Sequence, residues 1–179
     1  GNYHSSYNME NFIPLVPRTD KPLVIISTSR VNNRTESQPD SKMGYQNRYE
    51  ARLISYIVNE VIDAQPNTER EAFIEKIEEY IGIISAYGAQ VRLIRECLSK
   101  QNLGISDSQI RSMVASLDSF QGQERPLILY SLTRSTEFKK ADMGRVGFMK
   151  ELRRLNVAFT RCQKQLIIVG DIKYLTECN

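Results

Sequence analysis

The sequence predicts an α/β domain with a largely parallel sheet that helices cover on both faces. Three observations carry this prediction. Short apolar runs alternate along the chain with longer stretches of helical periodicity. The apolar runs are continuous rather than alternating, as expected of parallel strands that are buried on both faces. The length of 179 residues, without an internal repeat, suits one domain.

The strands are expected where the chain is apolar over a short distance and is bounded by polar residues or turn formers. They are predicted at 22–29, 81–85, 112–120, 126–132 and 165–171. The polar stretch 30–44 is rich in turn formers and is predicted to be a mobile loop.

The helices are expected where apolar residues recur three and four positions apart. They are predicted at 45–62, from Thr68 to about residue 80, at 87–100, at 148–161 and as a short C-terminal helix. In the charged helix that begins at Thr68, the side chains of Phe73, Ile77 and Tyr80 fall on one face.

The composition excludes several classes of protein. The net charge of +3 is too small to indicate nucleic acid by itself, and no apolar run approaches the roughly 18 residues that span a membrane. Three cysteines without CxxC spacing favour a reducing, intracellular (cytoplasmic) location. The single histidine, His4, excludes histidine-based catalysis and histidine-rich metal sites. It lies in residues 1–20, which we expect to form a disordered or extended tail before a domain at 21–179.

Ligands of such sheets bind at the carboxyl ends of the strands, and two groups of polar residues are expected there. Ser85, Tyr87 and Gln90 follow one strand. The turn QGQE follows another, and it contributes the residues Gln121, Gly122 and Glu124. Glycine would let the backbone approach a ligand closely, and a carboxylate would accept hydrogen bonds from a sugar hydroxyl. Read alone, the tetrapeptide is equally well a polar turn.

The helix at 148–161 carries two arginines, Arg154 and Arg161, which are seven positions apart and therefore share a face. Planar guanidinium groups at a strand end suit a polyphosphate, although exposed arginines are common and also pair with surface acids. Phe148, Leu152, Leu155 and Phe159 are predicted to form one buried stripe. Asp171, at the end of the last strand, is interpreted as a helix N-cap rather than as a metal ligand. The chain has no GxxxxGKS or GxxxxGKT phosphate loop.

Taken together, four segments resemble the second RecA-like domain of superfamily 1B helicases, in the branch with the nonsense-mediated-decay helicase, senataxin and the Dna2-type enzymes. The segments are GYQNRYEA, IGIISAYGAQVRLI, VASLDSFQGQE (motif V) and RRLNVAFTRCQKQLIIVGD (motif VI). They occur in the family's order between residues 44 and 171. Ala86 stands where the family usually has proline, and Cys162 replaces a common alanine.

The resemblance implies a RecA-like, P-loop NTPase-type fold and a role for each matching residue. Arg161 would be the arginine finger, and Arg48 would reach the same γ-phosphate. Glu124, Gly122, Gln121 and Arg154 would contact the nucleotide. Ser85, Tyr87 and Ser119 would contact single-stranded DNA or RNA.

Motifs I to III are absent, so the resemblance implies a C-terminal motor domain that works with an N-terminal RecA-like domain of the same parent chain. That partner would bind most of the ATP and Mg²⁺. By itself this chain is predicted to be inactive, and no membrane is expected to be involved. Two alternatives stay open: a stand-alone nucleic-acid-binding or regulatory module without ATPase activity, and an inert scaffold.

Overall fold

A computed structural model of the chain describes residues 21–32, 35–40, 44–120, 122–135 and 147–177. Its main feature is a sheet of five parallel strands in the order β1-β7-β6-β4-β5. The bounds are Leu23–Ser27 for β1, Ile81–Ser85 for β4, Val114–Ser116 for β5, Arg125–Ser131 for β6 and Cys162–Gly170 for β7. The predicted parallel sheet is therefore confirmed.

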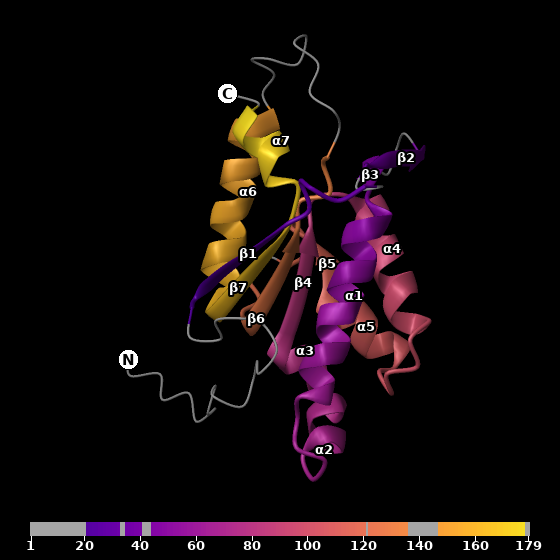
Figure 1. The fold of residues 1–179 in the computed structure, drawn as a ribbon. Coiled ribbons are helices and arrows are strands. Elements are labelled where there is room, and N and C mark those ends of the chain that lie inside the picture. Colours follow the sequence, from indigo (N-terminus) through magenta and orange to yellow (C-terminus); the bar gives the residue numbers. More distant parts are fainter. Residues whose placement is uncertain (1–20, 33–34, 41–43, 121, 136–146, 178–179) are drawn as a thin grey trace, which may run out of the picture.

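Helices cover both faces of the sheet (Figure 1). On one side lie α1 (Arg48–Asp63), α4 (Gly88–Ser99) and α5 (Asp107–Met113), and on the other lie α6 (Gly147–Arg161) and α7 (Ile172–Glu177). Two short helices, α2 (Arg70–Glu75) and α3 (Ile77–Tyr80), lie at the amino ends of the strands. This arrangement of layers is the predicted α/β, RecA-like class.

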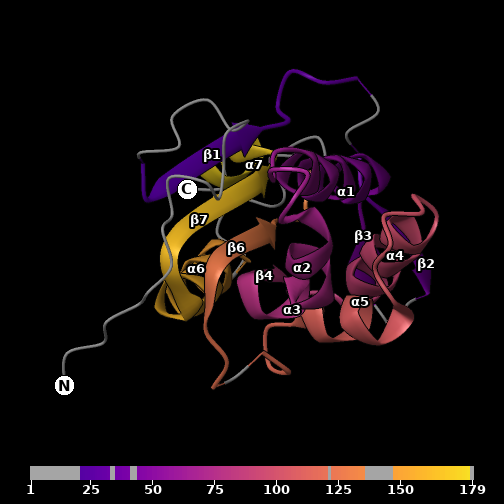
Figure 2. The ribbon, with the colours of Figure 1, turned by 90° about the horizontal axis from the view of Figure 1, so that it is seen from below.

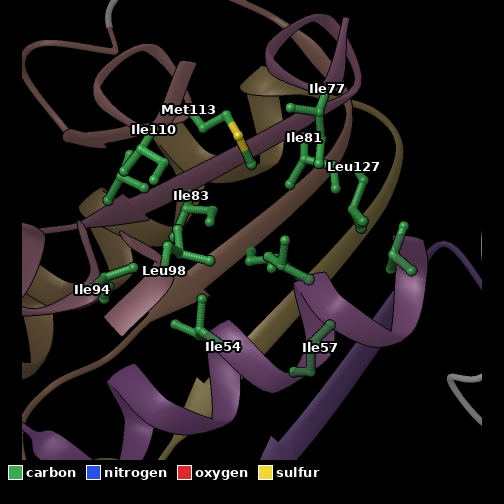
Figure 3. Close-up of a cluster of buried hydrophobic side chains, with 14 of the residues drawn as sticks. Ile54, Ile57, Ile77, Ile81, Ile83, Ile94, Leu98, Ile110, Met113 and Leu127 are labelled. Atoms are coloured by element: carbon green, nitrogen blue, oxygen red, sulfur yellow. The ribbon is translucent and has the colours of Figure 1, made fainter. Parts of the chain in front are cut away.

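The strands contribute side chains to two hydrophobic cores, one on each face of the sheet, because successive side chains of a strand point to opposite faces. Ile83, Leu129 and Ile167 belong to the larger core under α1, α4 and α5 (Figure 3). Their neighbours Ile84, Ile128 and Ile168 belong to the smaller core under α6. Every residue of β4 is buried, as are the last six of β6 and of β7, which explains why these runs are continuously apolar in the sequence.

Three elements differ from the prediction, each for a local reason. The predicted loop at 30–44 contains most of an antiparallel ribbon of β2 (Ser37–Asp40) and β3 (Gly44–Gln46). The predicted strand at 112–120 is only three residues long. It follows a helix, α5, that the sequence reading missed, although Ser106 and Gln109 form a capping box before it. The helix expected from Thr68 is interrupted at Lys76, where the backbone leaves the helical region.

The stripe predicted on α6 is wrong at Phe159, whose side chain is 45% exposed. Ala158 is the buried residue instead, and Leu155 packs against the smaller core. A small side chain at Ala158 lets the helix lie close to the sheet, which turns Phe159 outward. The side chains of Phe148 and Leu152 lie outside the described residues. The interpretation of Asp171 is confirmed, because its carboxylate accepts a hydrogen bond from the Tyr174 amide at 3.2 Å in the first turn of α7.

Candidate functional site

The residues that the sequence predicts to bind nucleic acid lie together at the carboxyl edge of the sheet. Ser85 is the last residue of β4 and pairs with Ser116 of β5. Ser119 follows in the turn after β5, and its hydroxyl lies 2.8 Å from that of Ser116. Tyr87 precedes α4 and is half-buried. Of the two predicted serines, Ser119 is the exposed one.

Ser85 itself does not face solvent. Its side chain is fully buried, and its hydroxyl lies 3.0 Å from the hydroxyl of Thr133 while it accepts a bond from the Tyr87 amide. A direct contact between Ser85 and a bound strand would require this hydroxyl to leave Thr133. In the structure Ser85 is part of the support of the edge rather than of its surface, which corrects the expected orientation.

Behind Ser85 lies a buried polar network that joins two of the four motif segments to the end of β6. Gln90 accepts a bond from the Asn47 amide at 2.7 Å and donates to the Asn47 carbonyl and to the Ser131 hydroxyl. Asn47 caps α1 by accepting from the Glu50 amide, and its side-chain amide donates to the carbonyl of Thr133. Gln90 therefore supports neighbouring segments as well as its own.

Glu50 is the centre of this network. Its carboxylate accepts bonds from the Ser131 hydroxyl at 2.6 Å, from the Thr133 amide at 2.8 Å and from Asn47 at 3.1 Å. Thr133 has a positive φ of 70°, which is strained for a β-branched residue, so the bonds from Glu50 and Asn47 hold an unfavourable backbone in place. The sequence reading missed Glu50. The available signal was a capping-box pattern, an asparagine followed three residues later by glutamate.

Burial raises the pKa of Glu50 to about 8, and the bonds from Ser131 and Thr133 only partly oppose that rise. The carboxyl is fully buried, and no basic side chain is among the groups that influence it. The Glu50 network is therefore held together by hydrogen bonds rather than by an ion pair.

Arginines and tyrosines surround the exposed side of the same edge. The guanidinium carbon of Arg134 lies 4.1 Å from the ring centroid of Tyr45, and its Nε donates to the carboxylate of Glu36 at 2.8 Å. The guanidinium carbon of Arg154 lies 5.6 Å from the ring centroid of Tyr87. Arg154, which the sequence assigned to the nucleotide, thus lies with the predicted nucleic-acid residues.

Two of the other predicted nucleotide residues, Glu124 and Arg161, lie at the opposite, amino edge. Arg125, the first residue of β6, pairs with Cys162, the first residue of β7. Glu124 and Arg161 immediately precede this pair in the chain, which places both residues at the amino edge. The prediction that the QGQE turn lies at the carboxyl ends of the strands is wrong for Glu124, because the chain crosses the sheet before this residue.

A β-bulge determines which residues meet at this edge. Between the pairs Arg125–Cys162 and Leu127–Gln165, β6 advances two residues while β7 advances three. Without the additional residue in β7, Glu124 would lie opposite Cys162 instead of Arg161. The bulge therefore aligns motif V with motif VI.

Arg161 and Glu124 make few contacts of their own. The Nε of Arg161 is buried and has no hydrogen-bond partner among the described residues. Glu124 is exposed, and within the described part of the chain it forms no ion pair with Arg161. Gly122, at a φ of +80°, has no atom within 4 Å of the position that a Cβ would take, so the backbone there is open to an approaching ligand. Gln121 lies outside the described residues.

Arg48 and Arg161 are not brought together. Arg48 is exposed at the start of α1, where its charge acts on Glu96 of α4. Arg161 ends α6, and α1 and α6 lie on opposite sides of the sheet (Figures 1 and 2). Within this domain, the positions of the two arginines do not bring them to a single phosphate.

One segment, residues 117–124, connects the two edges. Its first amide, that of Leu117, donates to the Ser85 carbonyl at the carboxyl edge, and it ends at Glu124 at the amino edge. Between them Phe120 is fully buried over Gly82 of β4, where a Cβ would lie 2.5 Å from the Phe120 ring. The ring can cross the sheet here because Gly82 has no side chain.

The described residues contain no group of three or more His, Cys, Asp or Glu side chains that could hold a metal ion. In the same part of the chain, no helix is long and apolar enough to span a membrane. At the amino edge, the buried Nε donor of Arg161 has no partner among the described residues, and a phosphate is a suitable acceptor for a guanidinium.

Comparisons with known proteins agree with this picture. A family model described as an AAA domain matches residues 4–173. The DNA polymerase alpha-associated DNA helicase A of Schizosaccharomyces pombe is 31% identical over 89% of this chain and 22% of its own length. The protein of that name from Saccharomyces cerevisiae is 43% identical over 56% of the chain and 13% of its length. The DNA replication ATP-dependent helicase/nuclease DNA2 of Mus musculus is 29% identical over 96% of the chain and 14% of its length. The chain thus spans less than a quarter of these relatives.

Proposed function

This chain belongs to the AAA-domain family of superfamily 1B-type helicases, and from that premise we propose that it is the C-terminal motor domain of an ATP-dependent helicase. In this proposal the amino edge contacts ATP and the carboxyl edge forms part of the groove for single-stranded DNA or RNA. A second RecA-like domain of the same parent chain supplies the phosphate loop and the acids that hold Mg²⁺.

The observation that carries the proposal is that Glu124 and Arg161 lie at the same edge of the sheet. The β6–β7 register brings the two residues together, and the buried Nε of Arg161 has no partner among the described residues. A guanidinium in this state is suited to an anion that another domain presents. Arg161 would stabilise the charge that develops on the γ-phosphoryl group during its transfer to water.

The other residues take supporting roles in the proposal. Glu124 would accept hydrogen bonds from the ribose hydroxyls. The open backbone at Gly122 and the neighbouring Gln121 would also contact the nucleotide. Arg48 and Arg154 stay predictions as nucleotide contacts. Arg48 would have to reach the phosphate from the opposite face of the sheet, and Arg154 would have to leave the ring of Tyr87.

At the carboxyl edge, Tyr87 and Ser119 would contact the nucleic-acid strand, while Ser85 would support them from below. Tyrosine rings and cationic side chains suit a strand whose bases and phosphates are both accessible. Contacts to the backbone carry no sequence information, so we expect little sequence preference.

The test compares this chain with its full-length parent. The chain alone should not hydrolyse ATP, and it should bind single strands weakly, with an affinity that falls as salt is added. The parent should hydrolyse ATP faster in the presence of single strands. ATP turnover by the chain alone would contradict the division of labour between two domains, and tight, salt-independent binding would favour a stand-alone binding module.

A further inference from the structure

Arg125 holds the segment that carries Glu124. Its guanidinium lies at the amino edge between this segment and the last turn of α3. Nη1 donates to the Glu124 carbonyl at 2.8 Å, Nη2 donates to the side-chain oxygen of Gln123 at 3.0 Å, and Nε donates to the Glu78 carbonyl. One side chain therefore connects the turn before β6 to a helix that precedes β4 in the chain.

The same guanidinium also contacts Phe120. Its central carbon lies 5.5 Å from the centroid of the Phe120 ring, and the Cγ of Arg125 is among the atoms nearest to Gly82. The five donors of an arginine have fixed directions in one plane, so three acceptors and a ring can be satisfied together only in one arrangement of the segment. A lysine, as a single point charge, could not reproduce that arrangement.

The exposed side chain of Glu124 makes no hydrogen bond or ion pair within the described part of the chain. Its position is therefore set by its backbone, and Arg125 is the side chain that binds this backbone at the Glu124 carbonyl. At Gly122, two residues earlier, a positive φ and the lack of surrounding atoms leave the chain otherwise free to move.

We propose that Arg125 is a positioning residue for the nucleotide site, which fixes the backbone of residues 122–124 so that Glu124 stays aligned with Arg161. This inference rests on the proposed function of the amino edge. Because Phe120 and Arg125 contact each other, the arginine also fixes the position of the end of segment 117–124. This segment is the connection between the two edges.

The chain offers a matched control in Arg95. This arginine is also partly buried, and it donates from Nε and Nη2 to the Val114 carbonyl and from Nη2 to the Arg111 carbonyl. Burial lowers the pKa of both Arg95 and Arg125. Arg95, however, binds α5 and the first residue of the outer strand β5, and among the described residues it makes no hydrogen bond to the turn that carries Glu124. A purely structural role for Arg125 predicts that the two arginines behave alike.

The experiment compares Arg125→Lys, Arg95→Lys and Arg161→Ala in the full-length protein. We expect Arg125→Lys to raise the KM for ATP on the order of tenfold with kcat changed far less, because Glu124 would bind the nucleotide in the ground state. Hydrogen exchange at residues 120–124 should become faster in this variant only. Arg95→Lys should lower Tm without a change in KM.

The outcomes separate the inference from the function on which it rests. If Arg161→Ala abolishes hydrolysis while Arg125→Lys matches Arg95→Lys in KM and in exchange, the positioning role is wrong and the proposed function stands. If Arg161→Ala leaves hydrolysis unchanged, the proposed function itself fails. Should Arg125→Lys not fold, Gln123→Ala removes only the acceptor of Nη2. It should show faster exchange and a smaller rise in KM, and the absence of both would overturn the inference.

Discussion

The motif residues at the carboxyl edge and at the amino edge of the sheet differ in how far their polar groups are occupied by the protein itself. At the carboxyl edge, Glu50, Gln90 and Asn47 bind one another and the end of β6, and none of their side-chain atoms is buried without a partner. At the amino edge, a buried guanidinium nitrogen of Arg161 has no partner among the described residues. A satisfied network supports a site, whereas unsatisfied donors indicate where a ligand binds.

This difference explains why motif residues should not be given similar roles merely because they occur in the same segment. The segment IGIISAYGAQVRLI contains Ser85, whose hydroxyl is buried, and Tyr87, which is half-exposed. Motif V likewise contains Phe120, a core residue, and Glu124, an exposed one. Burial therefore separates supporting residues from contacting ones within each motif.

The largest expected effect is at the amino edge. In the full-length protein, Arg161→Ala should slow the hydrolysis step by about 10³-fold or more, the range known for arginine fingers. ATP binding should weaken only modestly, and lysine should rescue poorly because it cannot form a bidentate fork. Single-turnover hydrolysis with saturating single strands measures this. A variant within a few-fold of the wild type would remove Arg161 from the mechanism.

At the carboxyl edge the largest effect should be on stability. Glu50→Ala leaves the Thr133 amide, the Ser131 hydroxyl and the Asn47 amide without their acceptor, and it should lower the free energy of unfolding by about 3 kcal/mol or more. The control is Glu124→Ala, which should stay within about 0.5 kcal/mol of the wild type because Glu124 is exposed. Denaturant titration measures both. Equal losses of unfolding free energy in the two variants would contradict the proposed difference between the two edges.

The raised pKa of Glu50 also predicts how stability depends on pH. Between its ordinary value of 4.5 and about 8, the folded state holds a proton that the unfolded state has released. Stability should therefore fall as pH rises through this window, by up to about 1.4 kcal/mol per pH unit from this group. Glu50→Gln should flatten that part of the profile. A wild-type Tm that increases from pH 5 to 8 with the same slope in both proteins would show that Glu50 is not responsible.

The smallest effect concerns two serines at the carboxyl edge. Ser119→Ala should weaken single-strand binding by about 1 kcal/mol, the contribution of one neutral hydrogen bond, with little loss of stability. Ser85→Ala should do the reverse, because its hydroxyl is buried against Thr133. Fluorescence anisotropy with a labelled single strand, together with Tm, distinguishes the two. A larger binding defect in Ser85→Ala would mean that its hydroxyl turns outward when the strand binds.

The sequence was sufficient for the fold because the signals are local. Continuous apolar runs marked the buried strands, and helical periodicity marked α1, α4 and α6. The strand pattern grouped Ser85 with Tyr87, whereas only the family resemblance added Ser119, which lay inside the strand predicted at 112–120. Prediction failed where long-range contacts decide the outcome. Nothing near Glu50 in the sequence shows that Thr133, 83 positions away, donates to it.

The amino edge illustrates a second limit. The sequence shows that QGQE lies next to a strand, but it does not show whether the turn lies at the carboxyl or the amino edge of the sheet. That depends on how Phe120 crosses over Gly82. The alignment of Glu124 with Arg161 depends further on one additional residue in β7. A pattern of residue types does not reveal a bulge. The family resemblance supplied the pairing of these motifs, and the structure supplies its physical reason.

The bulge in β7 also has a consequence for how the chain tolerates changes in length. Because the additional residue lies between Cys162 and Gln165, the core pairs from Leu127–Gln165 onward are independent of where Arg161 lies. A deletion of Gln163 or Lys164 would shift the arginine by one position relative to Glu124 while the buried strand keeps its register. Such a protein would fold normally and yet have a misaligned site. Insertions and deletions at this point therefore provide a way to vary catalysis in a helicase domain without a cost to its core.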